Sequence, residues 1–181
     1  MFPELERQCV IEEAGVDTVH SVVSEVLETM FFSEAEPAGC EHAWLVSAPC
    51  AWVRFEGSHC GEMQLAASMD AADAIAAGFL GLDPVELTEP VRGQVLEELA
   101  NILCGALLSQ LWPESKLALA SPKLTVWQEW TSPEWTRPEW LSQGAPSQAV
   151  LHRCFLLPEG MLAISIRLSS RPGQEGASRL Q

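Results

Sequence analysis

The sequence contains few basic residues. Ten Lys and Arg stand against 25 Asp and Glu, which gives a formal net charge of −15 at pH 7. A surface of this sign repels phosphate backbones and anionic lipid headgroups, so the composition argues against nucleic-acid and membrane-surface binding. The excess of acid predicts a solvated surface that keeps the protein in solution, and it would also suit a basic patch on a partner protein.

Long apolar runs and short catalytic motifs are also missing. The sequence contains no run of roughly 18 apolar residues, the length that a membrane-spanning helix requires, and its first residues lack the pattern of a secretory signal. No P-loop, dinucleotide-binding fingerprint or Gly-x-Ser-x-Gly elbow occurs. We therefore expect a cytoplasmic protein whose cysteines are free thiols. The cysteines are Cys9, Cys40, Cys50, Cys60, Cys104 and Cys154.

Length and composition favour one domain. The chain has 181 residues, is 48% hydrophobic and contains no long Gly/Ser or charged linker. We assign residues 1–170 to a single domain and residues 171–181, which have almost no apolar side chains, to a disordered tail. Residues 131–147 form a Trp- and Pro-rich insert that repeats Pro-Glu-Trp. Its tryptophans either fold back on the domain or form an aromatic docking strip.

The spacing of apolar residues predicts an α+β fold. Helical periodicity marks residues 9–32, 70–82 and 88–111. Strand-favouring composition or alternation marks residues 43–55, 62–67, 118–130, 150–157 and 161–168. Pro49 should bend or split the first of these strands. The order of elements favours an antiparallel sheet with long helices packed on one face.

The helix over residues 88–111 carries one polar stripe. At about 100° per residue, the side chains expected to face the core are Val95, Leu99, Ile102, Leu103 and Ala106. The residues expected on the opposite arc are Gln94, Glu98, Asn101, Gly105 and Leu108. This helix is the surface on which we expect function.

Glu98 and Asn101 are three residues apart, so their side chains project side by side. A carboxylate can bind a cation, and a carboxamide can donate and accept hydrogen bonds and so hold a water molecule in one orientation. Neither group is a strong nucleophile, which suits a reaction whose reactive group comes from a partner. Gly105 lets another backbone approach one turn later. On spacing alone, however, such a pair is more often a solvated helix face.

The stretch Glu98-Leu99-Ala100-Asn101-Ile102-Leu103-Cys104-Gly105, followed by Ser121-Pro122, resembles the signature of the CheX/CheC/FliY family of chemotaxis phosphatases. That signature is Glu-x-x-Asn on a long helix, a glycine one turn later and a proline further along. The likeness covers roughly residues 10–168 without the insert, and the segments 26–30, 57–67 and 159–164 also fit. Gln94 and the insert depart from the pattern, because the family often has Asp or Ser at the position of Gln94.

The resemblance implies a CheX-like fold and a phosphatase that acts on the aspartyl phosphate of a CheY-type response regulator receiver domain. By position, Glu98 would hold a lysine of the receiver and Asn101 would orient the attacking water. The resemblance places Gln94, Gly105 and Leu108 on the partner-binding face. Mg²⁺ would belong to the partner, so the chain would need no metal or cofactor of its own.

The first helix carries no second Glu-x-x-Asn motif, because Ser24-Glu25-Val26-Leu27-Glu28 has no Asn three residues after a Glu. One site per chain resembles CheX, whose members pair into dimers. The resemblance therefore implies a homodimer.

Two alternatives stay open. A non-catalytic CheX-like adaptor would keep the fold and bind a receiver or a signalling scaffold protein, and Gln94 and the insert favour this. A zinc site would require Cys40 and His42 to meet His59 and Cys60, and their spacing matches no standard zinc finger.

Overall fold

The fold is known from a computed structural model that describes residues 3–39, 45, 48–126 and 148–169. Its helices are α1 (Pro3–Met30), α2 (Met69–Leu80) and α3 (Glu89–Leu111), with a short 3-10 turn η2 (Pro84–Glu86). The strands are β1 (Glu36–Ala38), β2 (Pro49–Gly57), β3 (Cys60–Ala67), β4 (Leu117–Leu119), β5 (Lys123–Val126), β6 (Gln148–Leu157) and β7 (Gly160–Ser169). The insert over residues 131–147 and the tail over residues 171–181 lie outside the described residues.

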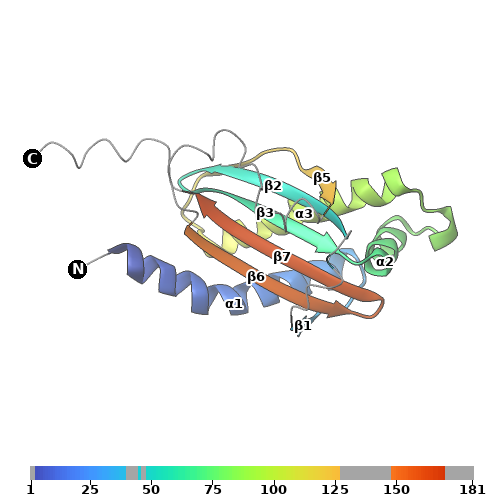
Figure 1. The fold of residues 1–181 in the computed structure, drawn as a ribbon, viewed down its shortest axis with the longest axis horizontal. Coiled ribbons are helices and arrows are strands. Elements are labelled where there is room, and N and C mark those ends of the chain that lie inside the picture. Colours follow the sequence, from blue (N-terminus) through green and yellow to red (C-terminus); the bar gives the residue numbers. More distant parts are fainter. Residues whose placement is uncertain (1–2, 40–44, 46–47, 127–147, 170–181) are drawn as a thin grey trace, which may run out of the picture.

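Among the described residues, all seven strands belong to one antiparallel sheet (Figure 1). Its order is β1-β6-β7-β3-β2-β4, and β5 pairs with the other end of β2. Two hairpins, β2–β3 and β6–β7, form the centre of the sheet because β3 pairs with β7. The sheet confirms the predicted α+β class.

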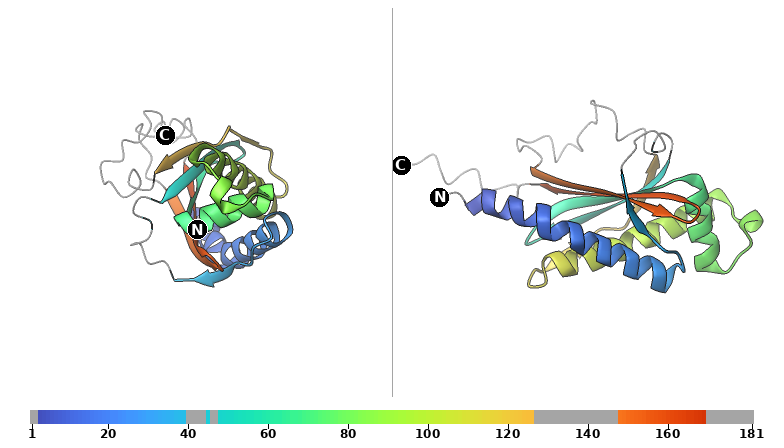
Figure 2. Two further views of the ribbon diagram at one scale, coloured as in Figure 1. Left: turned by 90° about the vertical axis from the view of Figure 1, so that its right-hand side faces the viewer. Right: turned by 90° about the horizontal axis from the view of Figure 1, so that it is seen from below.

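The helices cover one face of the sheet, and Figure 2 shows α1 and α3 side by side beneath it. Side chains alternate along each strand, so every second residue of β2, namely Ala51, Val53 and Phe55, is fully buried between sheet and helices. The same face of β3 contributes Met63 and Leu65. The predicted packing of long helices on one face is therefore confirmed.

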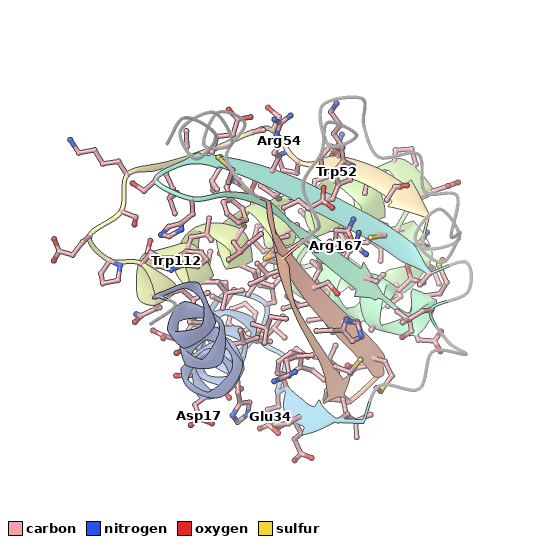
Figure 3. All side chains as sticks on the ribbon, turned by 60° about the vertical axis from the view of Figure 1, so that its left-hand side comes forward. Asp17, Glu34, Trp52, Arg54, Trp112 and Arg167 are labelled. Carbon is pink, nitrogen blue, oxygen red and sulfur yellow. The ribbon has the colours of Figure 1, made fainter. Side chains whose placement is uncertain are left out.

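The opposite face of the sheet combines a small apolar cluster with charged residues. The apolar cluster consists of Leu45, Ala48, Cys50, Ala66, Cys154 and Ala163. Arg54, Glu62 and Arg167 are register partners across β2, β3 and β7 (Figure 3). Glu62 is only 4% exposed, and this burial raises the pKa of its carboxyl even though Arg167 and Arg54 act in the opposite direction.

Capping residues explain where the two central helices begin and end. The Ser68 hydroxyl accepts a hydrogen bond from the Ala71 amide at the start of α2, and Gly81 ends that helix in the left-handed region at φ 64°. Thr88 occupies the N-cap position of α3, where its hydroxyl makes no capping hydrogen bond, and Pro90 lies in the first turn, where a missing amide hydrogen is tolerated. No helix in the described part of the chain is long and apolar enough to cross a membrane.

Proline positions account for most differences from the predicted elements. No element was predicted between residues 32 and 43, yet Glu36–Ala38 form the three-residue strand β1, which tolerates Pro37 because it lies at the sheet edge. Pro49 is the first residue of β2, so the predicted strand over residues 43–55 does not continue through it. Pro122 lies between β4 and β5, which divide the predicted strand over residues 118–130.

The expectation of free thiols is wrong for Cys154. This residue is disulfide-bonded, whereas Cys50, Cys60 and Cys104 are free. The prediction rested on an inferred reducing compartment. A compartment says nothing about which cysteines lie close enough in the fold to form a disulfide. Cys154 is nevertheless 2% exposed, as expected for a small buried residue.

Glu62→Gln should change the pH dependence of stability. Because burial raises the folded-state pKa of Glu62, the favourable contribution of its protonated form is complete below the unfolded-state pKa and disappears as pH rises through the folded-state pKa. The free energy of unfolding of the wild type should therefore fall relative to that of Glu62→Gln as pH rises from acid to neutral. Urea unfolding of both proteins across this range measures the difference. Parallel pH profiles would contradict the expectation.

Candidate functional site

The orientation of α3 places the predicted polar stripe at the surface. Leu99, Leu103 and Leu107 are fully buried against the sheet, which turns the opposite side of the helix outward. On that side the structure leaves Glu98 exposed and Asn101 half-buried. The two side chains that we selected from the sequence thus leave the same side of α3, one turn apart.

The polar groups of Glu98 and Asn101 make no polar contact with the rest of the described chain. Within residues 3–39, 45, 48–126 and 148–169, the Glu98 carboxylate and the Asn101 carboxamide make no hydrogen bond or ion pair. Gln94, one turn before Glu98, is exposed and is likewise without such a partner there. A carboxylate and a carboxamide that the fold does not use are available to a group from outside.

The polar arc ends before the helix does. Leu108 was expected to continue it, but its side chain is only 4% exposed and belongs to the main core. Ile102 and Ala106, which were expected in the core, are only partly buried. The wheel misplaces these residues because the buried face of α3 also includes Leu96, Ala100, Cys104 and Leu107, so it is turned toward Leu108 and away from Ile102 and Ala106.

An open recess of about 490 Å³ adjoins the start of the stripe. Gln94 and Glu98 supply its polar lining. Its apolar lining comes from the end of α2, the turn after it and the first half of α3, and consists of Phe79, Leu80, Leu82, Val91 and Val95. Sequence reasoning missed this recess, because it depends on how the end of α2 meets α3 rather than on either helix alone.

A second, smaller hollow of about 190 Å³ lies at the other end of the stripe. Gly105 and Leu108 line it together with residues of the chain that follows α3, namely Ser109, Trp112, Pro113, Ser115, Leu117 and Leu119. The Trp112 ring, labelled in Figure 3, stacks on His59 with ring centroids 4.4 Å apart. Asn101 therefore lies along α3 between two hollows, with Gln94 and Glu98 at one and Gly105 and Leu108 at the other.

An ion pair joins the two helices that form the larger recess. Arg92, in the first turn of α3, donates through Nε to Oδ1 of Asp73 on α2. The Arg92 side chain is 16% exposed and that of Asp73 is 34% exposed, so water screens the pair only in part. This contact joins the first half of α2 to the first turn of α3, just before the start of the stripe.

The other reactive side chains described lie elsewhere or are unreactive. Cys104 shares α3 with the pair, but it is buried, and burial raises the pKa of its thiol to about 12. His59 stacks on Trp112, His152 Nδ1 lies 2.6 Å from Ser165 Oγ, and His20 stacks on Phe155. Within the described residues, the stripe therefore offers a carboxylate and a carboxamide, and no activated nucleophile.

The part of the chain that the structure describes contains no cluster of three His, Cys, Asp or Glu side chains that could hold a metal ion. The zinc hypothesis requires Cys40 and His42, which lie outside the described residues.

Comparison with known proteins finds this fold among chemotaxis proteins. The family model described as chemotaxis phosphatase CheX matches residues 49–132, which include the elements from β2 through β5 and both Glu98 and Asn101. Chemotaxis protein CheX from Vibrio vulnificus superposes with a TM-score of 0.63 at 18% identity, covering 85% of this chain and 95% of that one. These matches, together with the CheC-like structure below, confirm the resemblance to the CheX/CheC/FliY family.

Two further solved structures share the fold. A CheC-like superfamily protein from Shewanella sp. PV-4 has a TM-score of 0.62 at 16% identity, covering 86% of this chain and 97% of that one. The CheX-CheY-BeF3-Mg²⁺ complex from Borrelia burgdorferi has a TM-score of 0.58 at 16% identity, with coverage of 86% and 97%. At these identities the likeness establishes the fold alone. No curated protein sequence matches the chain significantly.

Gly105→Ala should stabilise the protein. A Cβ atom at this position would lie 3.7 Å from Leu119 Cδ1, an ordinary contact, and alanine is favoured over glycine inside a helix by roughly 0.5–1 kcal/mol. Urea unfolding should show an increase of about this size in the free energy of unfolding. Gly93→Ala is the matched comparison, because its Cβ would lie 2.4 Å from Leu124 Cδ1, so the Leu124 side chain would have to move and the increase should be smaller. A destabilised Gly105→Ala would show that the site is less open than the structure indicates.

Proposed function

We propose that this protein is a phosphatase that removes the phosphoryl group from the aspartyl phosphate of a CheY-type receiver domain. The observation that carries the proposal is the Glu98/Asn101 pair, whose two polar groups are surface-accessible and unengaged by the described residues on the rigid helix α3. Glu98 would bind a basic side chain of the receiver, and Asn101 would orient the attacking water.

The chemistry fits the groups available. In the reaction, the water oxygen forms a bond to phosphorus while the bond between phosphorus and the aspartyl oxygen breaks, and the products are the aspartate carboxylate and inorganic phosphate. Such a transfer depends mainly on positioning and on electrostatic stabilisation, and it needs no nucleophile from the phosphatase. Asn101 suits the positioning role because its carboxamide can both donate to and accept from one water molecule. Mg²⁺, which neutralises phosphoryl charge, would be supplied by the receiver.

The comparisons support this choice of reaction and partner. The matching family model is described as a chemotaxis phosphatase, and its match includes both residues of the pair. The Borrelia burgdorferi CheX shares the fold and was crystallised in complex with CheY, BeF3 and Mg²⁺. These similarities supply the partner class, and the individual roles of Glu98 and Asn101 are carried over from the family signature; the exposure of the two side chains in this chain is what those roles require.

Asn101→Ala should abolish most of the catalysis and leave binding intact. Loss of one positioned water should slow dephosphorylation on the order of 10²-fold, while the dissociation constant changes little. Decay of a ³²P-labelled receiver measures the rate, and titration against the same receiver carrying BeF3⁻ measures the affinity. Gln110→Ala removes a carboxamide from an exposed position near the end of the same helix and should retain full activity. Equal losses in the two variants would exclude a specific role for Asn101.

Glu98→Gln should weaken the complex. Removing the charge that pairs with a basic group of the receiver should raise the dissociation constant by about tenfold and reduce its dependence on salt. The control is Glu97→Gln, which removes the same charge from the neighbouring residue of α3. If both variants weaken binding equally, the overall acidic field and not a specific contact at Glu98 accounts for the affinity.

The same assay separates the adaptor alternative. A chain that binds a phosphorylated receiver without accelerating its dephosphorylation is an adaptor. Gln94 lines the recess beside Glu98 and so lies where a change of partner would be accommodated.

A further inference from the structure

The recess beside Glu98 is lined mainly by apolar side chains that the proposed chemistry does not use. Phe79, Leu80 and Leu82 are 37%, 42% and 38% exposed, and all three line the recess where α2 ends. Exposed apolar side chains that gather beside a functional residue are typical of a protein interaction surface. Glu98 lines the recess and also belongs to the pair with Asn101, so the recess and the pair form one continuous surface.

The recess is held in shape by its surroundings. The Arg92–Asp73 ion pair joins α2 to α3, and Gly81 turns the chain through the left-handed conformation that separates Leu80 from Leu82. The Leu82 amide donates to the Ala77 carbonyl and closes the end of α2. A recess that exists before the partner arrives costs little ordering on binding.

The charge around the recess has one sign. Glu98 lines it, and Asp83 and Glu86 are exposed in the connection that joins its two helices. Arg92 is the sole basic residue of α2, this connection and the first half of α3, and it is paired with Asp73. A partner surface that complements the recess therefore combines a large apolar side chain with neighbouring basic groups.

We propose that the recess binds one large apolar side chain of the phosphorylated receiver, from a position next to the basic residue that contacts Glu98. The inference rests on the proposed function and adds how the partner is selected. Burial of that side chain against Leu80 and Leu82 supplies affinity and fixes the receiver along α3. Asn101, one turn beyond Glu98, then meets the phosphoryl group.

The test compares Leu80→Ser/Leu82→Ser with Leu156→Ser. Leu156 is 49% exposed on β6 and lies outside the recess, so it is a matched control. Affinity for receivers of the source organism loaded with BeF3⁻ and Mg²⁺ is measured in an Asn101→Ala background, and steady-state dephosphorylation is measured with Asn101 present. The double variant should raise both the dissociation constant and KM roughly tenfold, with kcat changed by less than about twofold. The control should change none of the three.

The outcomes are separable. Wild-type activity with an unchanged KM and dissociation constant in the double variant would overturn the recess and leave the proposed function standing. Failure of the wild type to bind any receiver and to accelerate its dephosphorylation would overturn both. If the double variant changes only the oligomeric state of the protein, measured by sedimentation, the recess is a contact between copies of this chain. That result would also overturn the inference. Unfolding curves confirm that the variants remain folded.

Discussion

Burial of one side of α3 against the sheet is the contact on which the functional surface depends. Leu99, Leu103 and Leu107 recur every four residues and are fully buried, and each contributes about 1.5–3 kcal/mol through the apolar area that it removes from water. Turning the helix about its axis would expose all three. The core thus holds the outward direction of Glu98 and Asn101, which have no hydrogen-bond partners of their own among the described residues. Side chains that are positioned without being engaged can offer their polar groups to a partner.

Helix α2 adds a second, weaker constraint. The Arg92–Asp73 ion pair links its first half to α3, and Ala72, Ile75 and Ala76 pack in the main core. Its last apolar residues, Phe79 and Leu80, lie beyond these core residues and remain partly exposed at the surface. Two kinds of side chain therefore line the recess: leucines of α2 and of the turn after it provide apolar contact area, and polar residues of α3 provide charge and hydrogen-bonding groups.

The sequence predicted those parts of the molecule that a local pattern determines. The spacing of apolar residues located α2 and α3 to within two residues, and it separated Glu98 and Asn101 from the core face. Leu108 was misplaced because the core face of α3 is turned toward Ala100 and Cys104, which the choice of apolar positions in the sequence had left out. The recess could not be predicted, since its two sides come from different helices. The disulfide of Cys154 and the edge strand β1 likewise depend on contacts between segments distant in sequence.

The two edges of the sheet have a consequence for how the protein behaves at high concentration. One edge is β1, a strand of three residues with Pro37 at its centre, and the other is divided between the short strands β4 and β5. Pro37 has no amide hydrogen to donate, and β4 and β5 are three and four residues long, so none of these described edge strands is itself a good template for another chain to extend into a fibril. Leu80 and Leu82 are thus exposed for recognition on a fold whose edge strands β1, β4 and β5 are too short for the strand pairing from which aggregation usually begins.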